Sequence, residues 1–254
     1  MEPPRFYCPV LAPGVVTLDA GESQHARRSL RLRPGDDVVL LDGCGRIAFG
    51  TLAGSADVPA SGAPARSRRG DNAVRVAVTD LRECARPACS LTLLVAACKG
   101  PRLDWLVEKC TELGVSRLVL TRFEHSVVHP GPQHIARLRR TAIEACKQCG
   151  RAWLPVIDGG IALADALARV SGSTLLVAHP DADAAPLGPW IAAHQAQPGN
   201  LAVVIGPEGG LSSAELAALQ SAGGQLVRLA PHTLRIETAA LAVAAVWAAS
   251  AEIA

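Results

Sequence analysis

Continuous apolar runs of strand length recur from about residue 90 onward. They occupy residues 91–97, 117–121, 174–178, 201–205 and 225–229. Strands that are apolar throughout are buried on both faces, as in parallel sheets covered by helices. Apolar residues at helical spacing predict a helix over roughly 103–113 and another over 134–149. This pattern predicts an α/β domain built on a parallel sheet.

Two more helices are predicted near the end of the chain. Ser212, Ser213, Ala214 and Glu215 have the pattern of a capping box, which marks the start of a helix. Residues 238–251 are apolar and mostly alanine, but they are too few to cross a bilayer. They therefore predict a buried helix, and no membrane partner is expected.

The first 52 residues have a different pattern, in which turn signals separate short β-like runs. Runs at 38–41 and 46–52 flank Asp42-Gly43, a strong signal for a hairpin. Alternation of apolar and polar positions over 73–81 predicts one more strand. These features predict a small β-barrel over residues 1–75, followed by the α/β domain over residues 76–254.

A segment without periodicity, residues 53–72, lies between the predicted strands of the barrel. It consists largely of Ala, Ser, Pro, Gly and Arg, and it predicts a loop. Arg66, Arg68 and Arg69 lie in it. They either contact phosphates or are simply solvated, and the pattern leaves both alternatives open.

Charge is distributed unevenly although the net charge is only +2. Residues 99–151 carry ten Lys/Arg against five Asp/Glu, whereas residues 152–254 carry three against eight. This asymmetry fits a face that binds a polyanion, with ordinary surface charge as the alternative. Aromatic residues make up only 3%, so an RNA partner would be bound through Arg, Lys and shape rather than a stacking platform.

The eight cysteines are scattered and do not form a paired framework. Cys146 and Cys149 form one CxxC, but zinc needs more ligands than a single pair supplies, so no metal is expected. The first residues lack the apolar core of a signal peptide. A reduced, cytoplasmic protein is the simplest expectation.

Ligands of parallel α/β sheets bind at loops beyond the carboxyl ends of the strands. Three such loops are expected, at 178–182, 206–210 and 230–238. The second contains three glycines around Pro-Glu, so a ligand can approach its backbone closely. It matches neither the P-loop nor the GxGxxG fingerprint, which favours a flat purine held by backbone groups over a phosphate. A tight strand-to-helix turn is the alternative.

The third loop brings two charges to the start of an otherwise uncharged helix. Arg235 and Glu237 flank Ile236 there, and charges that enter a buried element need partners. They form either a structural ion pair or a polar patch that faces the ligand site. His179, in the first loop, is a weaker candidate for a base, with a simple backbone contact as the alternative.

These residues also carry a family resemblance. The segments that carry it are Gly206-Pro207-Glu208-Gly209-Gly210-Leu211-Ser212, Leu234-Arg235-Ile236-Glu237-Thr238-Ala239-Ala240-Leu241, Lys99-Gly100, Glu108-Lys109, Glu112-Leu113-Gly114-Val115, Ser126-Val127-Val128, Glu144, Gln148, Gly150-Arg151, His25, Leu30-Arg31, Gly35-Asp36 and Asp42-Gly43. The chain resembles the ribosomal RNA small subunit methyltransferase E family of the SPOUT superfamily over nearly its whole length. His125 and Lys147 depart from it, since an Arg and an acid respectively are common there, and Ala230-Pro231-His232 departs from its usual Gly-x-Arg.

The resemblance implies a PUA-like β-barrel that binds RNA, followed by a SPOUT domain with a C-terminal trefoil knot, an exception to the rule against threaded chains. It implies S-adenosylmethionine (SAM) as the cofactor, a homodimer, and N3-methylation of one uridine in 16S rRNA of the small ribosomal subunit. The alternatives are a SPOUT enzyme that acts on another RNA, and a non-catalytic RNA-binding protein of the same fold.

Candidate site residues follow from the loops and the resemblance together. Arg235 is expected to stabilise a developing uracil anion, and Glu237 to orient it or act as a base. The cofactor-binding candidates are Ala178, His179, Pro180, Ile205, Gly206, Pro207, Glu208, Gly209, Gly210, Leu229, Leu234, Arg235, Glu237 and Thr238. The RNA-binding candidates are Arg28, Arg31, Arg33, Lys99, Arg102, Arg122 and Arg151.

Overall fold

The computed structural model describes residues 2–54, 73–181, 183–194 and 199–250. The chain divides into two compact units. The first consists of residues 1–86 with 146–153, and the second of residues 87–145 with 154–254. The loop expected at 53–72, with its three arginines, lies almost entirely outside the described residues.

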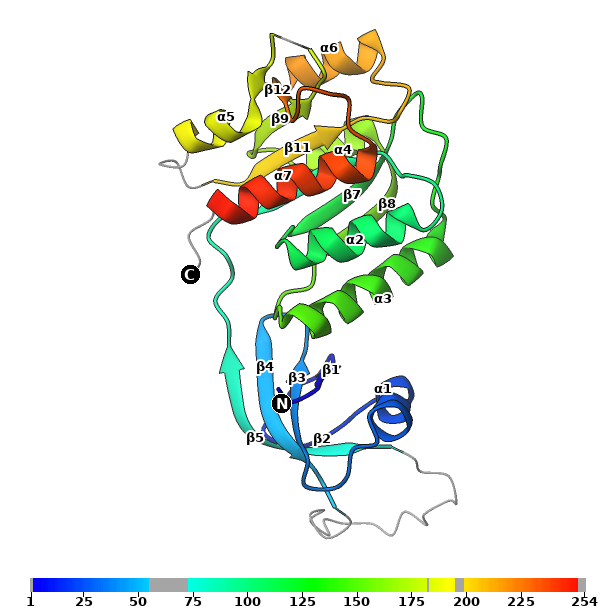
Figure 1. Cartoon of the computed structure of the whole chain (residues 1–254), viewed down its shortest axis with the longest axis vertical. Coiled ribbons are helices and arrows are strands. Elements are labelled where there is room, and N and C mark those ends of the chain that lie inside the picture. The colour runs from blue at the N-terminus through cyan, green and yellow to red at the C-terminus, as the bar shows by residue number, and fades with distance from the viewer. Residues whose placement is uncertain (1, 55–72, 182, 195–198, 251–254) are drawn as a thin grey trace. The chain divides into compact units, whose positions relative to one another are not determined.

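The smaller unit is built on a five-stranded sheet with the order β1-β3-β4-β5-β2, in which only β1 and β3 pair in parallel (Figure 1). The predicted hairpin is β3 and β4, and Asp42 fixes its turn by accepting hydrogen bonds from the backbone of Cys44 and Arg46. Its elements are β1 (Arg5–Tyr7), β2 (Gly14–Thr17), α1 (Ala20–Gln24), the π-helix η1 (His25–Ser29), β3 (Asp37–Leu41), β4 (Arg46–Leu52) and β5 (Arg75–Glu83).

The larger unit is built on a seven-stranded sheet with the order β10-β12-β9-β11-β6-β7-β8, and every neighbouring pair is parallel. Its strands are β6 (Leu91–Val95), β7 (Arg117–Arg122), β8 (Val156–Ala162), β9 (Thr174–Ala178), β10 (Ala185–Pro186), β11 (Leu201–Ile205) and β12 (Gln225–Arg228). All five apolar runs are strands of this sheet, so the predicted α/β class is confirmed.

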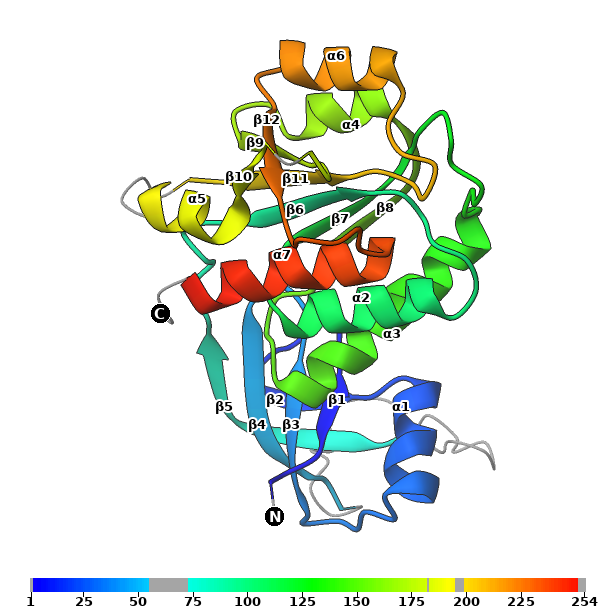
Figure 2. The same ribbon diagram turned by 45° about the horizontal axis from the view of Figure 1, so that its top comes forward.

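Helices cover both faces of this sheet (Figure 2). On one face lie α4 (Leu163–Arg169) and α6 (Ser213–Ser221), and on the other lie α2 (Arg102–Glu112), α3 (Pro132–Cys149) and α7 (Ile236–Ser250). The remaining helix, α5 (Leu187–His194), packs against α7. Two covered faces explain why the central strands β6 and β11 are buried along their whole length.

The predicted capping box is present at the start of α6. The Ser212 side chain accepts a hydrogen bond from the Glu215 backbone, and the Glu215 carboxylate accepts one from the Ser212 backbone. The predicted alanine-rich helix is α7, which is packed against α2, β6 and β11. None of the helices within the described ranges is long and apolar enough to cross a membrane.

Candidate functional site

Three loops of the larger unit meet beside the carboxyl ends of β9, β11 and β12. These strands are neighbours in the sheet although they are far apart in the chain, because β9 pairs with both of the others. The loops enclose a cavity of about 270 Å³. It is lined by Ala178, His179, Pro180, Ile205, Gly206, Pro207, Glu208, Gly210, Leu211, Arg228, Leu229, Ala230, His232, Thr233, Leu234, Ile236 and Ala239.

The three loops singled out in the sequence thus border one cavity. Four of the cofactor-binding candidates do not line it: Gly209, Arg235, Glu237 and Thr238. Several lining residues were not among the candidates, namely Leu211, Arg228, Ala230, His232, Thr233, Ile236 and Ala239. Each of these residues is close in sequence to a candidate. Wider boundaries for the predicted loops would therefore have included them.

Glycine is required in the second loop by close contacts and by backbone conformation. A Cβ added at Gly206 would lie 3.0 Å from the Leu211 side chain, and Gly210 has a φ of +78°. Few other residues adopt that conformation without strain. The loop therefore presents its backbone directly to the cavity.

The side chains of Arg235 and Glu237 have different surroundings although they are two residues apart. Glu237 is buried, and its Oε1 atom lies 3.6 Å from Nε of Arg102 on α2. Arg235 is exposed, and its backbone carbonyl accepts a hydrogen bond from Ala239 in the first turns of α7. Within the described part of the chain its guanidinium has no ion-pair partner. The two residues were expected to form either an ion pair with each other or a polar patch that faces the ligand site. The structure shows no direct Arg235–Glu237 ion pair.

A buried thiol reports the electrostatics at the end of β6. Burial, followed by the carboxylates of Glu237 and Glu208, raises the pKa of Cys98 to about 11, while Arg102 acts in the opposite direction. Glu208 lines the cavity, so two carboxylates contribute negative potential to this end of the sheet.

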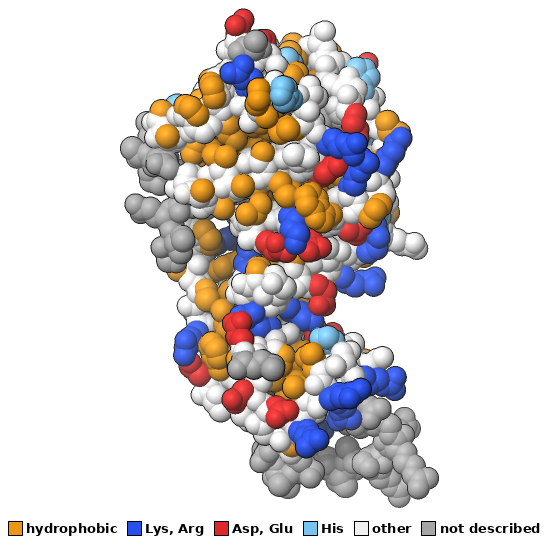
Figure 3. Space-filling view, in the orientation of Figure 1, with side chains coloured by type: hydrophobic (Ala, Val, Ile, Leu, Met, Phe, Trp, Pro, Cys, Tyr) orange, Lys and Arg blue, Asp and Glu red, His pale blue; other side chains and the backbone are white. Residues whose placement is uncertain are grey.

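The RNA-binding candidates are distributed over both units. Six of them are exposed: Arg28, Arg31, Arg33, Lys99, Arg102 and Arg122. Arg151 is half-buried, and burial lowers its pKa. Lys and Arg side chains gather over α1 and the following π-helix (Figure 3). Just after that π-helix, Arg31 has a φ of 54°, the one positive value of a non-glycine residue in the described ranges.

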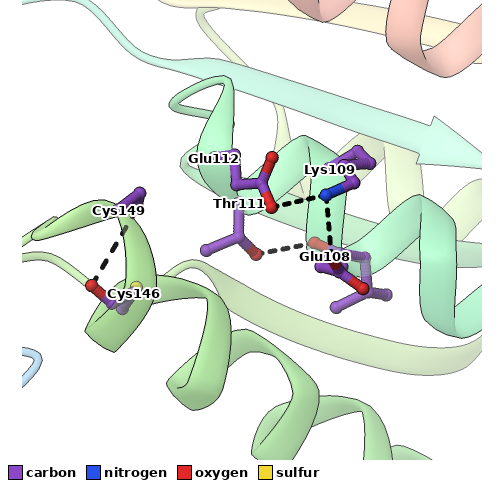
Figure 4. A network of polar contacts seen from close by, with 7 residues as sticks. Glu108, Lys109, Thr111, Glu112, Cys146 and Cys149 are labelled. Atoms are coloured by element: carbon purple, nitrogen blue, oxygen red, sulfur yellow. Dashed lines mark hydrogen bonds and ion pairs between the residues drawn. The ribbon is translucent and has the colours of Figure 1, made fainter.

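Helix α2 carries the Glu-Lys segment of the family resemblance on its surface. Nζ of Lys109 donates hydrogen bonds to Glu108 at 2.8 Å and to Glu112 at 2.7 Å (Figure 4). These hydrogen bonds raise the pKa of Lys109, and the bond to Glu108 has the largest effect. The lysine is thus a structural partner of two carboxylates on its own helix.

Cys146 and Cys149 lie in the last turn of α3. The Cys149 thiol points to the Cys146 backbone carbonyl, with 3.9 Å between the sulfur and the oxygen (Figure 4). Burial raises the pKa of Cys146 to about 12. Across the described ranges, no group of three or more His, Cys, Asp or Glu side chains is arranged to hold a metal ion.

Comparison with known families gives the class of the protein. The sequence matches the RNA methyltransferase domain family over residues 85–248 and an RNA methyltransferase PUA domain over residues 18–57. The first match covers the larger unit, including all three loops of the cavity. The larger unit is therefore an RNA methyltransferase domain.

Individual relatives narrow this class. The ribosomal RNA small subunit methyltransferase E of Mycobacterium bovis is 34% identical over 237 residues, which cover 89% of this chain and 83% of the relative. A crystal structure of a ribosomal RNA small subunit methyltransferase E from Neisseria gonorrhoeae bound to SAM is 28% identical, covers 96% of each chain and has a TM-score of 0.80. A methyltransferase from Legionella pneumophila in complex with SAM is 26% identical over 98% of each chain, with a TM-score of 0.81.

The chain therefore belongs to the ribosomal RNA small subunit methyltransferase E family. This confirms the resemblance found in the sequence, including its PUA-like first domain.

Proposed function

We propose that this protein transfers a methyl group from SAM to N3 of one uridine in 16S rRNA of the small ribosomal subunit. The observation that carries the proposal is the convergence of three loops on one cavity at the carboxyl edge of the parallel sheet. Family membership and two SAM-bound structural neighbours support the cofactor and the type of reaction.

The residues at the cavity suit the chemistry of SAM. The cavity volume of about 270 Å³ lies just below the usual range of ligand pockets, which is about 300 to 1,000 Å³. Apolar side chains such as Leu211 and Leu229 and the backbone of Gly206–Gly210 suit a purine ring. The carboxylate of Glu208 suits a sulfonium cation. When bound, SAM supplies an electrophilic methyl group.

The protein's own residues must manage the charge of the uracil base. Uracil N3 carries a proton and lies on the Watson–Crick edge, so the base must be unpaired and must lose that proton. Arg235 is the proposed group that stabilises the developing anion, because it is exposed beside the cavity loop and always charged. Glu237 takes a positioning role, since it is buried next to Arg102 at the first turn of α7.

RNA contact is assigned to the basic candidates of both units, all of them exposed except the half-buried Arg151. Arg28, Arg31 and Arg33 supply phosphate contacts from the barrel, and Lys99, Arg102, Arg122 and Arg151 supply them from the remainder of the chain. Membership of the family further supports a cytoplasmic homodimer whose SPOUT domain is knotted.

The proposal is tested with SAM and small ribosomal subunits that lack the modification. Incubation with the protein is expected to produce 3-methyluridine at one position of 16S rRNA, mapped by mass spectrometry of nuclease fragments. Calorimetry with SAM tests the cofactor separately. Methylation of a different RNA or atom would overturn the proposed substrate, and the absence of SAM binding would favour a non-catalytic RNA-binding role.

A further inference from the structure

A segment that does not itself line the cavity contacts the glycine loop. It is the turn after β7, and its His125 side chain has Nδ1 3.1 Å from the backbone carbonyl oxygen of Gly210. A Cβ added at Gly209 would lie 2.9 Å from Cβ of His125. Gly209 is the one residue of the Gly206–Gly210 loop that does not line the cavity, whereas Gly210, whose carbonyl contacts His125, does line it.

A carboxylate makes a second link between the same two segments. Oε2 of Glu215 accepts a hydrogen bond from the Ser212 backbone at 2.9 Å, which closes the capping box of α6. Oε1 of the same group accepts a hydrogen bond from the Glu124 backbone at 2.7 Å. One side chain therefore joins the turn after β7 to the end of the glycine loop.

The turn that carries His125 is itself fixed. The Ser126 hydroxyl accepts a hydrogen bond from the Phe123 backbone at 2.9 Å, and the Phe123 carbonyl accepts one from the Ser126 backbone at 3.1 Å. The Phe123 side chain is buried in the core of the larger unit. His125 is therefore presented from an anchored turn and not from a loose loop.

We propose that His125 and Glu215 are positioning residues that hold the Gly206–Gly210 loop in the shape its cofactor requires. A segment with three glycines loses much conformational entropy when it becomes ordered, and contacts that order it beforehand improve ligand affinity. This assignment rests on the proposed function, since it takes SAM as the ligand of the cavity. It gives His125 a role toward the cofactor and not toward the RNA.

The main test is calorimetry of SAM binding to the full chain carrying His125→Ala. Loss of one hydrogen bond that orders the loop is expected to weaken binding about 3- to 10-fold, with the turnover number at saturating SAM nearly unchanged. His125→Asn keeps a donor near the Gly210 carbonyl and is expected to recover most of the affinity. His129→Ala is the matched control, because His129 is exposed on the same segment and does not line the cavity.

Thermal unfolding separates loop positioning from general stability. The three variants are expected to unfold within a few degrees of the unsubstituted protein. The inference is overturned if His125→Ala binds SAM normally, or if His125→Asn binds SAM as weakly as His125→Ala does. Failure of the unsubstituted protein to bind SAM would instead overturn the proposed function, so the two failures are distinguishable.

Discussion

Arg235 and Glu237 show how two neighbouring charges in one segment acquire separate roles. Because Glu237 enters the helix and is buried, it needs a nearby cation, and Arg102 on α2 provides one at 3.6 Å. Arg235 precedes the helix and stays exposed. The segment therefore presents one guanidinium outward while its carboxylate is held inside.

Replacement of this guanidinium tests its role in the reaction. Arg235→Ala is expected to lower the methylation rate at least 100-fold, the usual order for removal of one group that stabilises a transition-state anion. SAM binding, measured by calorimetry, should remain within a few-fold of normal because Arg235 does not line the cavity. Arg235→Lys keeps the charge but not the donor geometry and should recover little activity. Near-normal turnover of the alanine variant would exclude Arg235 from the chemistry.

Gly209 and His125 are expected to be energetically coupled. Gly209→Ala places a Cβ 2.9 Å from that of His125, so it should displace the loop and weaken SAM binding about 10-fold or more. His125→Gly removes the opposing Cβ, so Gly209→Ala should have a smaller effect in that background. Calorimetry on the four proteins gives the coupling energy. Strictly additive effects would show that the two residues do not act on each other.

Helix α6 begins directly after the glycine loop of the cavity. A capping box stabilises its first turn, because the side chains of Ser212 and Glu215 each accept a hydrogen bond from the other residue's backbone. Ser212→Ala is expected to lower the free energy of unfolding by about 1 kcal/mol, measured by urea denaturation. Ser213→Ala is the matched control, because Ser213 is exposed and its side chain does not cap the helix. Equal effects of the two substitutions would mean that the cap adds no stability.

Prediction from sequence succeeded where an element carries a strong local signal, such as a continuous apolar run, a turn dipeptide or a capping motif. The five apolar runs, the hairpin at Asp42-Gly43 and the capping box at Ser212 are present as expected. The strand β8 was missed because its sequence, VIDGGIA, contains two glycines and an aspartate and has no continuous apolar run. Helix α4, with seven residues, is too short to show a helical period.

The sequence predicted which loops form the candidate site, but it did not predict the side-chain contacts between segments that are distant in the chain. Loops at the ends of parallel strands can be located from the strands alone, which is why the three loops around the cavity were found. The contact of His125 with Gly210 joins residues 85 positions apart, and no local pattern specifies it. The same holds for Arg102 and Glu237, which meet only because α2 and α7 pack together.

At the scale of the whole molecule, the affinity for RNA is expected to fall with salt concentration because arginines of the smaller unit contact phosphates. Arg31→Ala combined with Arg33→Ala should weaken binding of 16S rRNA fragments and reduce the slope of log affinity against log salt by about one unit for each residue. Filter binding between 50 and 200 mM salt measures both quantities. An unchanged slope would show that these arginines do not contact phosphates.

Stability of the smaller unit is expected to depend on a buried ion pair. Nζ of Lys147 lies 2.8 Å from Glu22, and both side chains are less than 10% exposed. Lys147→Met leaves a buried carboxylate without its cation and is expected to cost about 3–5 kcal/mol, measured by urea denaturation. The double variant with Glu22→Gln should recover part of that loss.

A second lysine with carboxylate partners provides the control for this prediction. Lys109 contacts Glu108 and Glu112 on the surface of α2 (Figure 4), where solvent screens the charges. Lys109→Met should change the unfolding free energy little. A comparable loss at both positions would contradict the importance of burial.

The contribution of residues 146–153 to the smaller unit has a consequence for synthesis on the ribosome. Gly45 donates a hydrogen bond to the carbonyl of Ala152, Arg5 donates one to Gln148, and Glu22 contacts Lys147. Residues 1–86 therefore leave the exit tunnel before these partners have been translated. The last contacts of the smaller unit form only after residues 87–153 have followed, so this unit is completed while the larger unit is still being synthesised.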